Sequence, residues 1–254
     1  MSKLPVNQRG ISLISLMIAL LIGSFLLAGL FQVWFQTRQT FSAQAQLAQL
    51  QDNERMALTI MANTVQTGGY YPIYLNYPPN TPPSTPYSIG GSFPVIGDYT
   101  VAGQSIFGTG TASTTGTGDT LEVRFVADSN TLDCLGQPDL TGSLVVNTYA
   151  VVGTNLQCTV NVTTSAGAKT ATGPLTVVAG VKNMTVTYNV AIPGTTTNQY
   201  MNATTVAADT DWAHVQSANI TLTFNNPLFG QPGQPATVSP ISRVVAITVP
   251  NPNP

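Results

Sequence analysis

The most hydrophobic part of the chain lies at its N-terminal end. Residues 11–35 are almost wholly apolar, and no charged residue occurs between Gly10 and Thr37. This stretch is longer than the roughly 20 residues that a helix needs to cross a bilayer, and longer than the roughly 7–15 apolar residues of a cleaved secretory signal. Because Lys3 and Arg9 precede it, we expect a membrane-spanning helix whose C-terminus lies outside the cytoplasm.

Beyond this stretch the apolar residues are confined to one helical face. No proline or glycine occurs between Thr37 and Thr67, and Gly68 and Gly69 then provide a typical helix end. One apolar stripe, interrupted by Glu54, is formed by Leu47, Leu50, Ala57, Met61 and Val65. We therefore predict one continuous helix over residues 11–67, about 85 Å long. Residues 36–69 form its amphipathic part, which we expect to pack on a folded domain.

Residues 70–119 follow as the least regular region. Prolines and tyrosines repeat over residues 70–94, and residues 108–118 are rich in Gly, Thr and Ser. This composition predicts connecting loops. The alternative interpretation of the first loop is a tyrosine-bearing contact surface, but we favour a connector that lies over the sheet.

Alternation of apolar and polar residues then predicts a β-rich domain over residues 120–249. In TLEVRFV, for example, Leu121, Val123 and Phe125 alternate with Glu122 and Arg124. The predicted strands are residues 120–126, 143–152, 156–164, 183–190, 218–224 and 243–249, with a turn at residues 153–155 and the last strand closing the sheet. The tail, residues 250–254, is expected to be flexible.

The composition agrees with a domain outside the cytoplasm. Only 7% of the residues are charged and the net charge is −2. Because binding to nucleic acid needs many cations to neutralise phosphates, we expect no direct nucleic-acid binding.

The chain has two cysteines, Cys134 and Cys158, which do not have CxxC spacing. In an exported protein we favour a disulfide, which would stabilise the fold by about 3 kcal/mol, over two unrelated buried thiols.

The N-terminal pattern resembles that of type IV pilin-like proteins. It consists of a short basic leader that ends in Gly10, followed by ISLISLMIALLIGSF and a long helix. More narrowly, the chain is similar to PilW-type minor pilins in four segments: NERMALTIMANTVQTGGYYP, GDTLEVRFVADSNTLDCLGQP, VVAGVKNMTVTYNV and SANITLTFNNP. The resemblance implies an α+β fold of lollipop shape. A long N-terminal helix, with its apolar half protruding and its amphipathic half packed, would join a C-terminal antiparallel β-sheet domain.

The resemblance also implies how the N-terminus is processed. A prepilin peptidase would remove the leader, residues 1–10, after Gly10, and Ile11 would then be N-methylated. The retained helix, residues 11–35, would anchor the chain in the inner membrane with its C-terminus in the periplasm, and would later join a filament at the cell surface. The implied partners are other minor pilins, the major pilin, the prepilin peptidase and the inner-membrane assembly platform.

Ser15 departs from the family pattern. It is the fifth residue after the expected cleavage site, where most members carry a glutamate that is thought to pair with the N-terminus of a neighbouring subunit. Three interpretations remain open: a position at the filament tip, as in tip pseudopilins that lack the acid; docking through other minor pilins; or a tolerated change in which the hydroxyl bonds to the carbonyl of Ile11.

Residues with catalytic potential are few. We interpret His214, the single histidine, as a surface or packing residue. Asp128, Asn130 and Asp133 are placed in turns rather than in a calcium site, because their spacing does not fit an EF-hand. We therefore expect no enzyme activity, no metal and no cofactor.

The sequence thus predicts a minor pilin that initiates type IV pilus assembly at or near the tip. The alternatives are a minor pseudopilin of a type II secretion system, a tip adhesin, and an ordinary membrane protein with a single span.

Overall fold

The computed structural model describes residues 13–72, 93–110, 118–192, 194, 197–209 and 211–247. The chain divides into two compact units, Met1–Ala48 and Gln49–Pro254, which are considered separately below. Gly10, Ile11, most of the Tyr/Pro-rich loop and the C-terminal tail lie outside the described residues.

A single helix, α1 (Leu13–Gln66), begins in the first unit and ends in the second. The predicted long helix is therefore confirmed, with its end within one residue of the expected position. After Gln66 the chain turns at Gly69, which has a φ of 76°. The amide of Gly69 donates to the carbonyl of Arg124, and Val126 donates to the carbonyl of Tyr70. These bonds attach the end of α1 to the domain.

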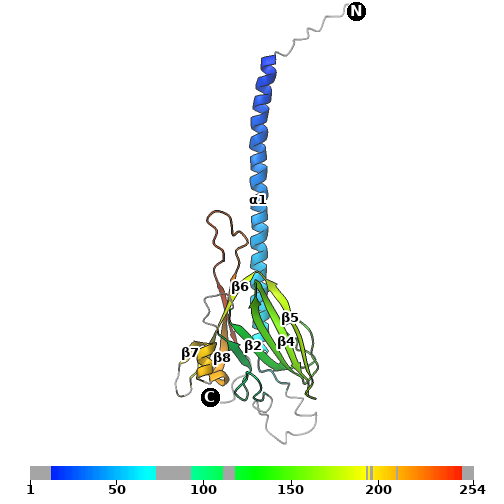
Figure 1. Ribbon diagram of the computed structural model, residues 1–254, viewed down its shortest axis with the longest axis vertical. Helices are drawn as coiled ribbons and strands as arrows, with labels where there is room; N and C mark the ends of the chain where they lie inside the picture. Colours follow the sequence, from blue (N-terminus) through cyan, green and yellow to red (C-terminus); the bar gives the residue numbers. More distant parts are fainter. Residues whose placement is uncertain are drawn as a thin grey trace, which may run out of the picture. The chain divides into compact units, whose positions relative to one another are not determined.

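The second unit contains two antiparallel sheets (Figure 1). The five-stranded sheet has the order β1-β2-β3-β4-β5, formed by Ile106–Thr109, Thr120–Val126, Leu144–Val152, Asn155–Thr163 and Lys169–Ala179. The four-stranded sheet has the order β7-β6-β8-β9, formed by Asn198–Asn202, Val181–Ala191, Val215–Phe224 and Ile241–Ala246. A short helix, α3 (Ala203–Ala208), and the 3-10 helix η2 (Asp211–His214) connect β7 to β8.

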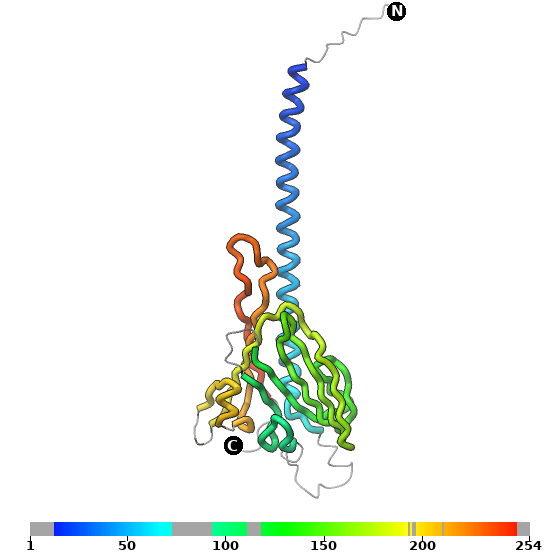
Figure 2. Tube along the Cα trace, in the orientation of Figure 1, coloured from blue at the N-terminus to red at the C-terminus, as the bar shows by residue number. Residues whose placement is uncertain are grey.

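The antiparallel β-domain is confirmed, but its strands form two sheets rather than one. Gly180, with a φ of 87°, separates β5 from β6. Its amide donates to Thr154 in the turn of the first sheet, and its carbonyl accepts from Asn225 after β8 of the second. The chain therefore changes sheets at a single residue, as the yellow-green to yellow segment in Figure 2 shows.

The strand predictions differ from the structure in several details. Val152 pairs with Asn155, so the β3–β4 turn has two residues, not three, and Asn155 belongs to β4. The last strand begins earlier than predicted, at Ile241. Three strands were not predicted: β1, β5 and β7. Each lacks a clear alternation, because β1 is short and contains Gly108, β5 contains Gly173 and Pro174, and β7 is mostly polar.

The core of the second unit lies around the C-terminal part of α1. Ala57, Met61 and Val65 are fully buried there. They belong to one apolar cluster with buried residues of both sheets, among them Phe125, Tyr149, Leu156, Met184, Tyr188 and Ile220. The predicted stripe is thus confirmed for its last three residues, whereas Leu50 is partly buried and Leu47 is 38% exposed.

Candidate functional site

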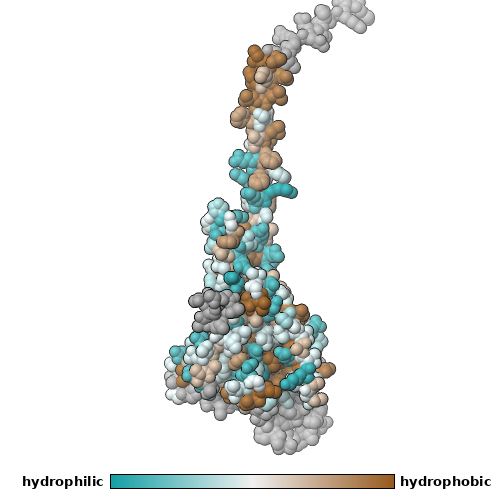
Figure 3. All heavy atoms as spheres, in the orientation of Figure 1, coloured by the Kyte–Doolittle hydropathy of each residue, from teal (hydrophilic) through white to brown (hydrophobic). Residues whose placement is uncertain are grey.

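The first unit presents a continuous apolar surface. Every large apolar side chain from Leu13 to Phe35 is at least 51% exposed. In Figure 3 these hydrophobic residues colour the N-terminal part of α1 brown, and polar residues follow further along the helix. The helix is long and apolar enough to cross a membrane. Because water does not solvate such a surface favourably, it requires lipid or other apolar helices as its surroundings.

Polar side chains in this region form hydrogen bonds to the backbone of the same helix. The hydroxyl of Ser24 donates to the carbonyl of Leu21 at 2.8 Å, and that of Thr37 donates to Val33 at 2.8 Å. A helix with its hydroxyls bonded in this way has few polar groups that need an external partner.

A cluster of aromatic residues marks the end of the apolar surface. The rings of Phe31 and Trp34 lie 5.8 Å apart, and the guanidinium of Arg38 lies 4.8 Å from the centre of the Trp34 ring. Trp residues favour membrane–water interfaces, and Arg side chains extend to the aqueous side of that boundary. The apolar surface thus ends at side chains of the kind that favour a membrane–water interface.

The processing residues predicted from the sequence are only partly described. Ser15 lies near the first described turn of α1 and is exposed. Gly10 and Ile11 lie outside the described residues, so their roles stay predictions.

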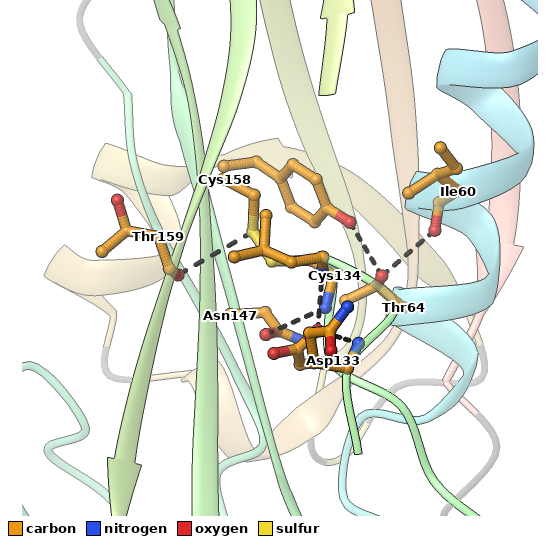
Figure 4. The surroundings of a disulfide bond; sticks show 10 residues. Ile60, Thr64, Asp133, Cys134, Asn147, Cys158 and Thr159 are labelled. Carbon is orange, nitrogen blue, oxygen red and sulfur yellow. Dashed lines mark hydrogen bonds between the residues drawn. A yellow bond between two sulfur atoms is a disulfide. The ribbon is translucent and has the colours of Figure 1, made fainter. Parts of the chain in front are cut away.

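The disulfide is the best-defined polar and covalent cluster of the second unit (Figure 4). Cys134 and Cys158 are bonded, as predicted, with their Cα atoms 6.4 Å apart. The amide of Cys134 also donates to the side chain of Asn147 on β3 at 3.3 Å. The bond therefore holds the loop around residue 134 against the five-stranded sheet.

Beside the disulfide, α1 is joined to the sheet by a buried hydrogen bond. The hydroxyls of Thr64 and Tyr149 lie 2.8 Å apart, and Thr64 also donates to the carbonyl of Ile60. Burial raises the pKa of Tyr149 well above its ordinary value, so the phenol stays protonated. The contact fixes the position of α1 over β3.

A groove of about 680 Å³ opens between these elements. It is lined by Met56, Ile60, Asn63 and Thr64 of α1, by Thr67, by the loop Asn130–Gly136, and by Leu175, Thr176 and Val177 of β5. Three apolar side chains at the groove remain about half exposed, with exposures of 51% for Met56, 54% for Leu132 and 52% for Leu175. The groove was not predicted, because its lining comes from three elements that are distant in sequence.

Arg124 lies on the face of β2 opposite to Leu121, Val123 and Phe125, as the alternation in TLEVRFV indicates, but this face is not open to solvent. The residue is fully buried, and Glu122 beside it is only partly exposed. The reason is tertiary, because residues 93–105 return over the outer face of β2 and cover it. The amide of Arg124 donates to the carbonyl of Ser105 in this segment.

The guanidinium of Arg124 is held by backbone carbonyls and aromatic rings. It donates to Gln104, to Pro94 at 2.8 Å and to Phe93 at 3.2 Å. It also lies 4.1 Å from the ring centre of Tyr99. Burial lowers the pKa of Arg124 to about 10, so the group remains charged at neutral pH. We interpret it as a structural clasp for residues 93–105.

The remaining polar candidates belong to turns. Asp128 accepts hydrogen bonds from the amides of Asn130 and Thr131, and from Tyr70 at 2.6 Å. One oxygen of Asp133 accepts from the amides of Leu135 and Gln137. These bonds support the turn interpretation.

His214 lies where a packing residue is expected. It lies in η2 beside the buried Trp212, with Nδ1 3.6 Å from a carboxylate oxygen of Asp211. This pair could be an ion pair only with a protonated imidazole.

Two family models match parts of the chain. Residues 6–31 match the prokaryotic N-terminal methylation motif, and residues 145–246 match the family described as type IV pilus-assembly protein W. A solved structure, the type IV-like pilin from Thermus thermophilus, is similar with 14% identity and a TM-score of 0.41; the alignment covers 78% of this chain and 96% of that one. We found no match among curated proteins.

Proposed function

We propose that this chain, which matches the methylation motif over residues 6–31 and the PilW family over residues 145–246, is a type IV pilin-like minor pilin that initiates pilus assembly. It would act as a structural subunit without a catalytic role, in a complex of minor pilins at or near the filament tip. The observation that carries this proposal is the exposed apolar surface of residues 13–35, which overlaps the matched motif over residues 13–31.

Processing would occur between Gly10 and Ile11. Both residues lie within the matched motif, where the short basic leader meets the apolar segment. Cleavage there leaves the whole apolar helix on the mature chain. N-methylation of Ile11 would follow.

The same helix can serve in the membrane and in the filament. An apolar cylinder with a fully hydrogen-bonded backbone is stable in lipid and equally stable among other apolar helices. Transfer from the inner membrane into a filament therefore exchanges one apolar environment for another. We propose that other minor pilins and the major pilin supply those helices, and that the second unit lies in the periplasm.

Ser15 would limit which neighbouring subunits this helix can bind. A carboxylate in an apolar bundle is unfavourable unless it is paired, so it favours docking next to a cationic N-terminus. The hydroxyl of Ser15 cannot form that ion pair. A position at the tip, with no further subunit to recruit in this way, fits the substitution.

The N-terminal residue of the mature chain tests the proposal most directly. Mass spectrometry of the membrane-extracted chain should show N-methylated Ile11, and cells without prepilin peptidase should retain the leader. A mature chain that begins at Met1, or beyond Phe35, would contradict the proposal.

A deletion tests the role in initiation. Removal of the gene should abolish pili while the major pilin remains in the membrane, and complementation should restore them. Loss of protein secretion with normal pili would instead indicate a pseudopilin of a secretion system. Ser15→Glu should change the position or stoichiometry of the subunit, and an unchanged filament would remove the special role of this residue.

A further inference from the structure

The strand β5 is exposed to an unusual degree. It is eleven residues long, and residues 169–176 are exposed on both faces of the sheet. Within the residues that the structure describes, no strand pairs with its outer edge, because β5 ends the five-stranded sheet (Figure 1). Such an edge presents unpaired backbone N–H and C=O groups, which favour the addition of another strand.

The two halves of β5 differ in how they protect this edge. The first half contains Lys169 and Pro174, and charge and proline both disfavour strand addition. The second half, Leu175–Val178, contains neither. It is also rich in valine, which favours extended structure. The unprotected half is the part that lines the groove.

The groove provides an apolar site for the side chains of an added strand. Met56 and Ile60 of α1 and Leu132 of the disulfide-bound loop contribute apolar surface to it. From Met56 to Thr67 the helix covers about 16 Å, a length that about five residues of extended chain span. Asn53 of α1 donates to the carbonyl of Ala179 at 3.3 Å, so α1 lies close to the C-terminal end of this edge.

The charge of the groove defines the chemistry of its occupant. Of the described residues that line it, Asp133 alone has an ionisable side chain, and one of its oxygens already binds two amides of its own loop. A charged segment would thus lose its hydration without gaining a matching opposite charge. An uncharged segment with small or apolar side chains avoids this penalty.

We propose that the outer edge of Leu175–Val178 and the adjoining groove receive an extended, uncharged segment of a neighbouring pilus subunit, which adds a strand to β5. The inference rests on the proposed function for the identity of the donor. Backbone hydrogen bonds would supply the affinity, and alternate side chains in the groove the selectivity.

Photo-crosslinking in cells that make pili tests this contact with the full-length chain. A photoreactive phenylalanine analogue is placed at position 175, with position 170 as a matched control on the protected half of the same strand. We expect at least tenfold more adduct from position 175, mapped by mass spectrometry to an uncharged, non-transmembrane segment of another pilus subunit. Equal yields, or an adduct with lipid, with an apolar helix or with a second copy of this chain, would overturn the proposal.

A second pair of variants tests the groove itself. With the crosslinker at position 56, Leu175→Lys should lower the adduct at least tenfold, whereas Thr170→Lys should leave it unchanged. Leu175 is half exposed, so the variant should fold, and its thermal unfolding checks this directly. An adduct that persists in a folded Leu175→Lys variant contradicts the proposal.

Amide hydrogen exchange separates strand addition from contact through side chains alone. When the purified full-length chain in detergent is mixed with the subunit identified by crosslinking, exchange at Leu175–Val178 should slow at least tenfold, and that at Thr170 should not change. Unchanged exchange at all of these positions would overturn strand addition. The mature N-terminus is measured on the same samples: a processed chain without these contacts refutes only this inference, and an unprocessed chain refutes the proposed function.

Discussion

Residues 13–35 and residues 49–66 belong to one helix, yet their apolar side chains have opposite surroundings. Leu21 in the first segment is 60% exposed, whereas Met61 in the second is fully buried. Neither segment contains proline, and both are regular helix. Helical propensity therefore does not explain the difference.

The arrangement of apolar residues explains it. In residues 49–66 they form a stripe, and the sheets of the same chain cover that stripe. In residues 13–35 they surround the helix, and a single domain packed on one side cannot cover such a surface. The first segment thus depends on lipid or other chains, and the second depends on its own domain. Four predictions, in order of expected effect, test this division.

The largest effect is expected from a cavity in residues 49–66, the segment that the sheets of the same chain cover. Met61→Ala should lower the free energy of unfolding of the domain by about 2–5 kcal/mol. Met56→Ala, at a half-exposed position on the same helix, should change it by less than about 0.5 kcal/mol. Urea unfolding of the full-length chain in detergent measures both. Equal losses would show that the buried stripe does not determine the stability of the domain.

A charge in residues 13–35 should weaken insertion of the chain into the membrane without lowering the stability of the domain. Ile18→Arg should make insertion less favourable by about 3 kcal/mol. Gln36→Arg, just beyond the apolar surface, is the control. Extraction of membranes with carbonate should release more of the Ile18→Arg protein, while the unfolding temperature of the domain stays the same. A lower unfolding temperature would mean that the two segments are coupled.

Loss of the disulfide should act on the domain alone. Its cysteines are 24 residues apart, and removal of the cross-link should lower the free energy of unfolding by about 3 kcal/mol. The double variant Cys134→Ser, Cys158→Ser can be compared with the reduced wild type by urea unfolding. Membrane insertion should not change. A change in insertion would argue against independent behaviour of residues 13–35.

The smallest effect concerns the attachment of the chain just after α1. The hydrogen bond from Tyr70 holds the pKa of Asp128 below its ordinary value, and backbone amides reinforce this. Its contribution is therefore fully present above the ordinary pKa of aspartate, near 4, and is lost as the pH falls through the lowered folded pKa. Tyr70→Phe should lower the free energy of unfolding by about 1–2 kcal/mol at pH 7.

The pH dependence of this difference provides the control. The gap between wild type and Tyr70→Phe should narrow as the pH falls through the lowered folded-state pKa of Asp128, because both proteins then carry a protonated Asp128. Urea unfolding at several pH values measures the gap. A difference that does not depend on pH would show that packing of the Tyr70 ring, and not the carboxylate, is responsible.

The sequence allowed the helix, the disulfide and six of the strands to be predicted because each depends on local pattern or compartment. Period-two alternation and β-branched residues identified β2, β3, β4, β6, β8 and β9. The same pattern is missing from β5, since both of its faces are exposed over most of its length and polarity cannot alternate there. The change of sheet at Gly180 resembles an ordinary turn in sequence, because only its long-range bonds to Thr154 and Asn225 distinguish it.

The groove and the burial of Arg124 could not be predicted from the sequence for a different reason. A lone cation between apolar residues in a strand normally faces water, and only the return of residues 93–105 places Arg124 inside. The groove likewise depends on three elements that are distant in sequence. Such features arise from tertiary contacts, so they have no local signature. The predicted processing site, by contrast, depends on sequence alone and awaits the N-terminal measurement.

The contacts around Arg124 bear on how the stability of this domain depends on the salt concentration of the medium. Its cation is held by carbonyl dipoles and ring faces in the interior, where dissolved ions do not reach it. The chain as a whole has few charges whose attraction or repulsion salt could screen. A fold built in this way should keep nearly the same unfolding temperature as the salt concentration of the medium rises or falls.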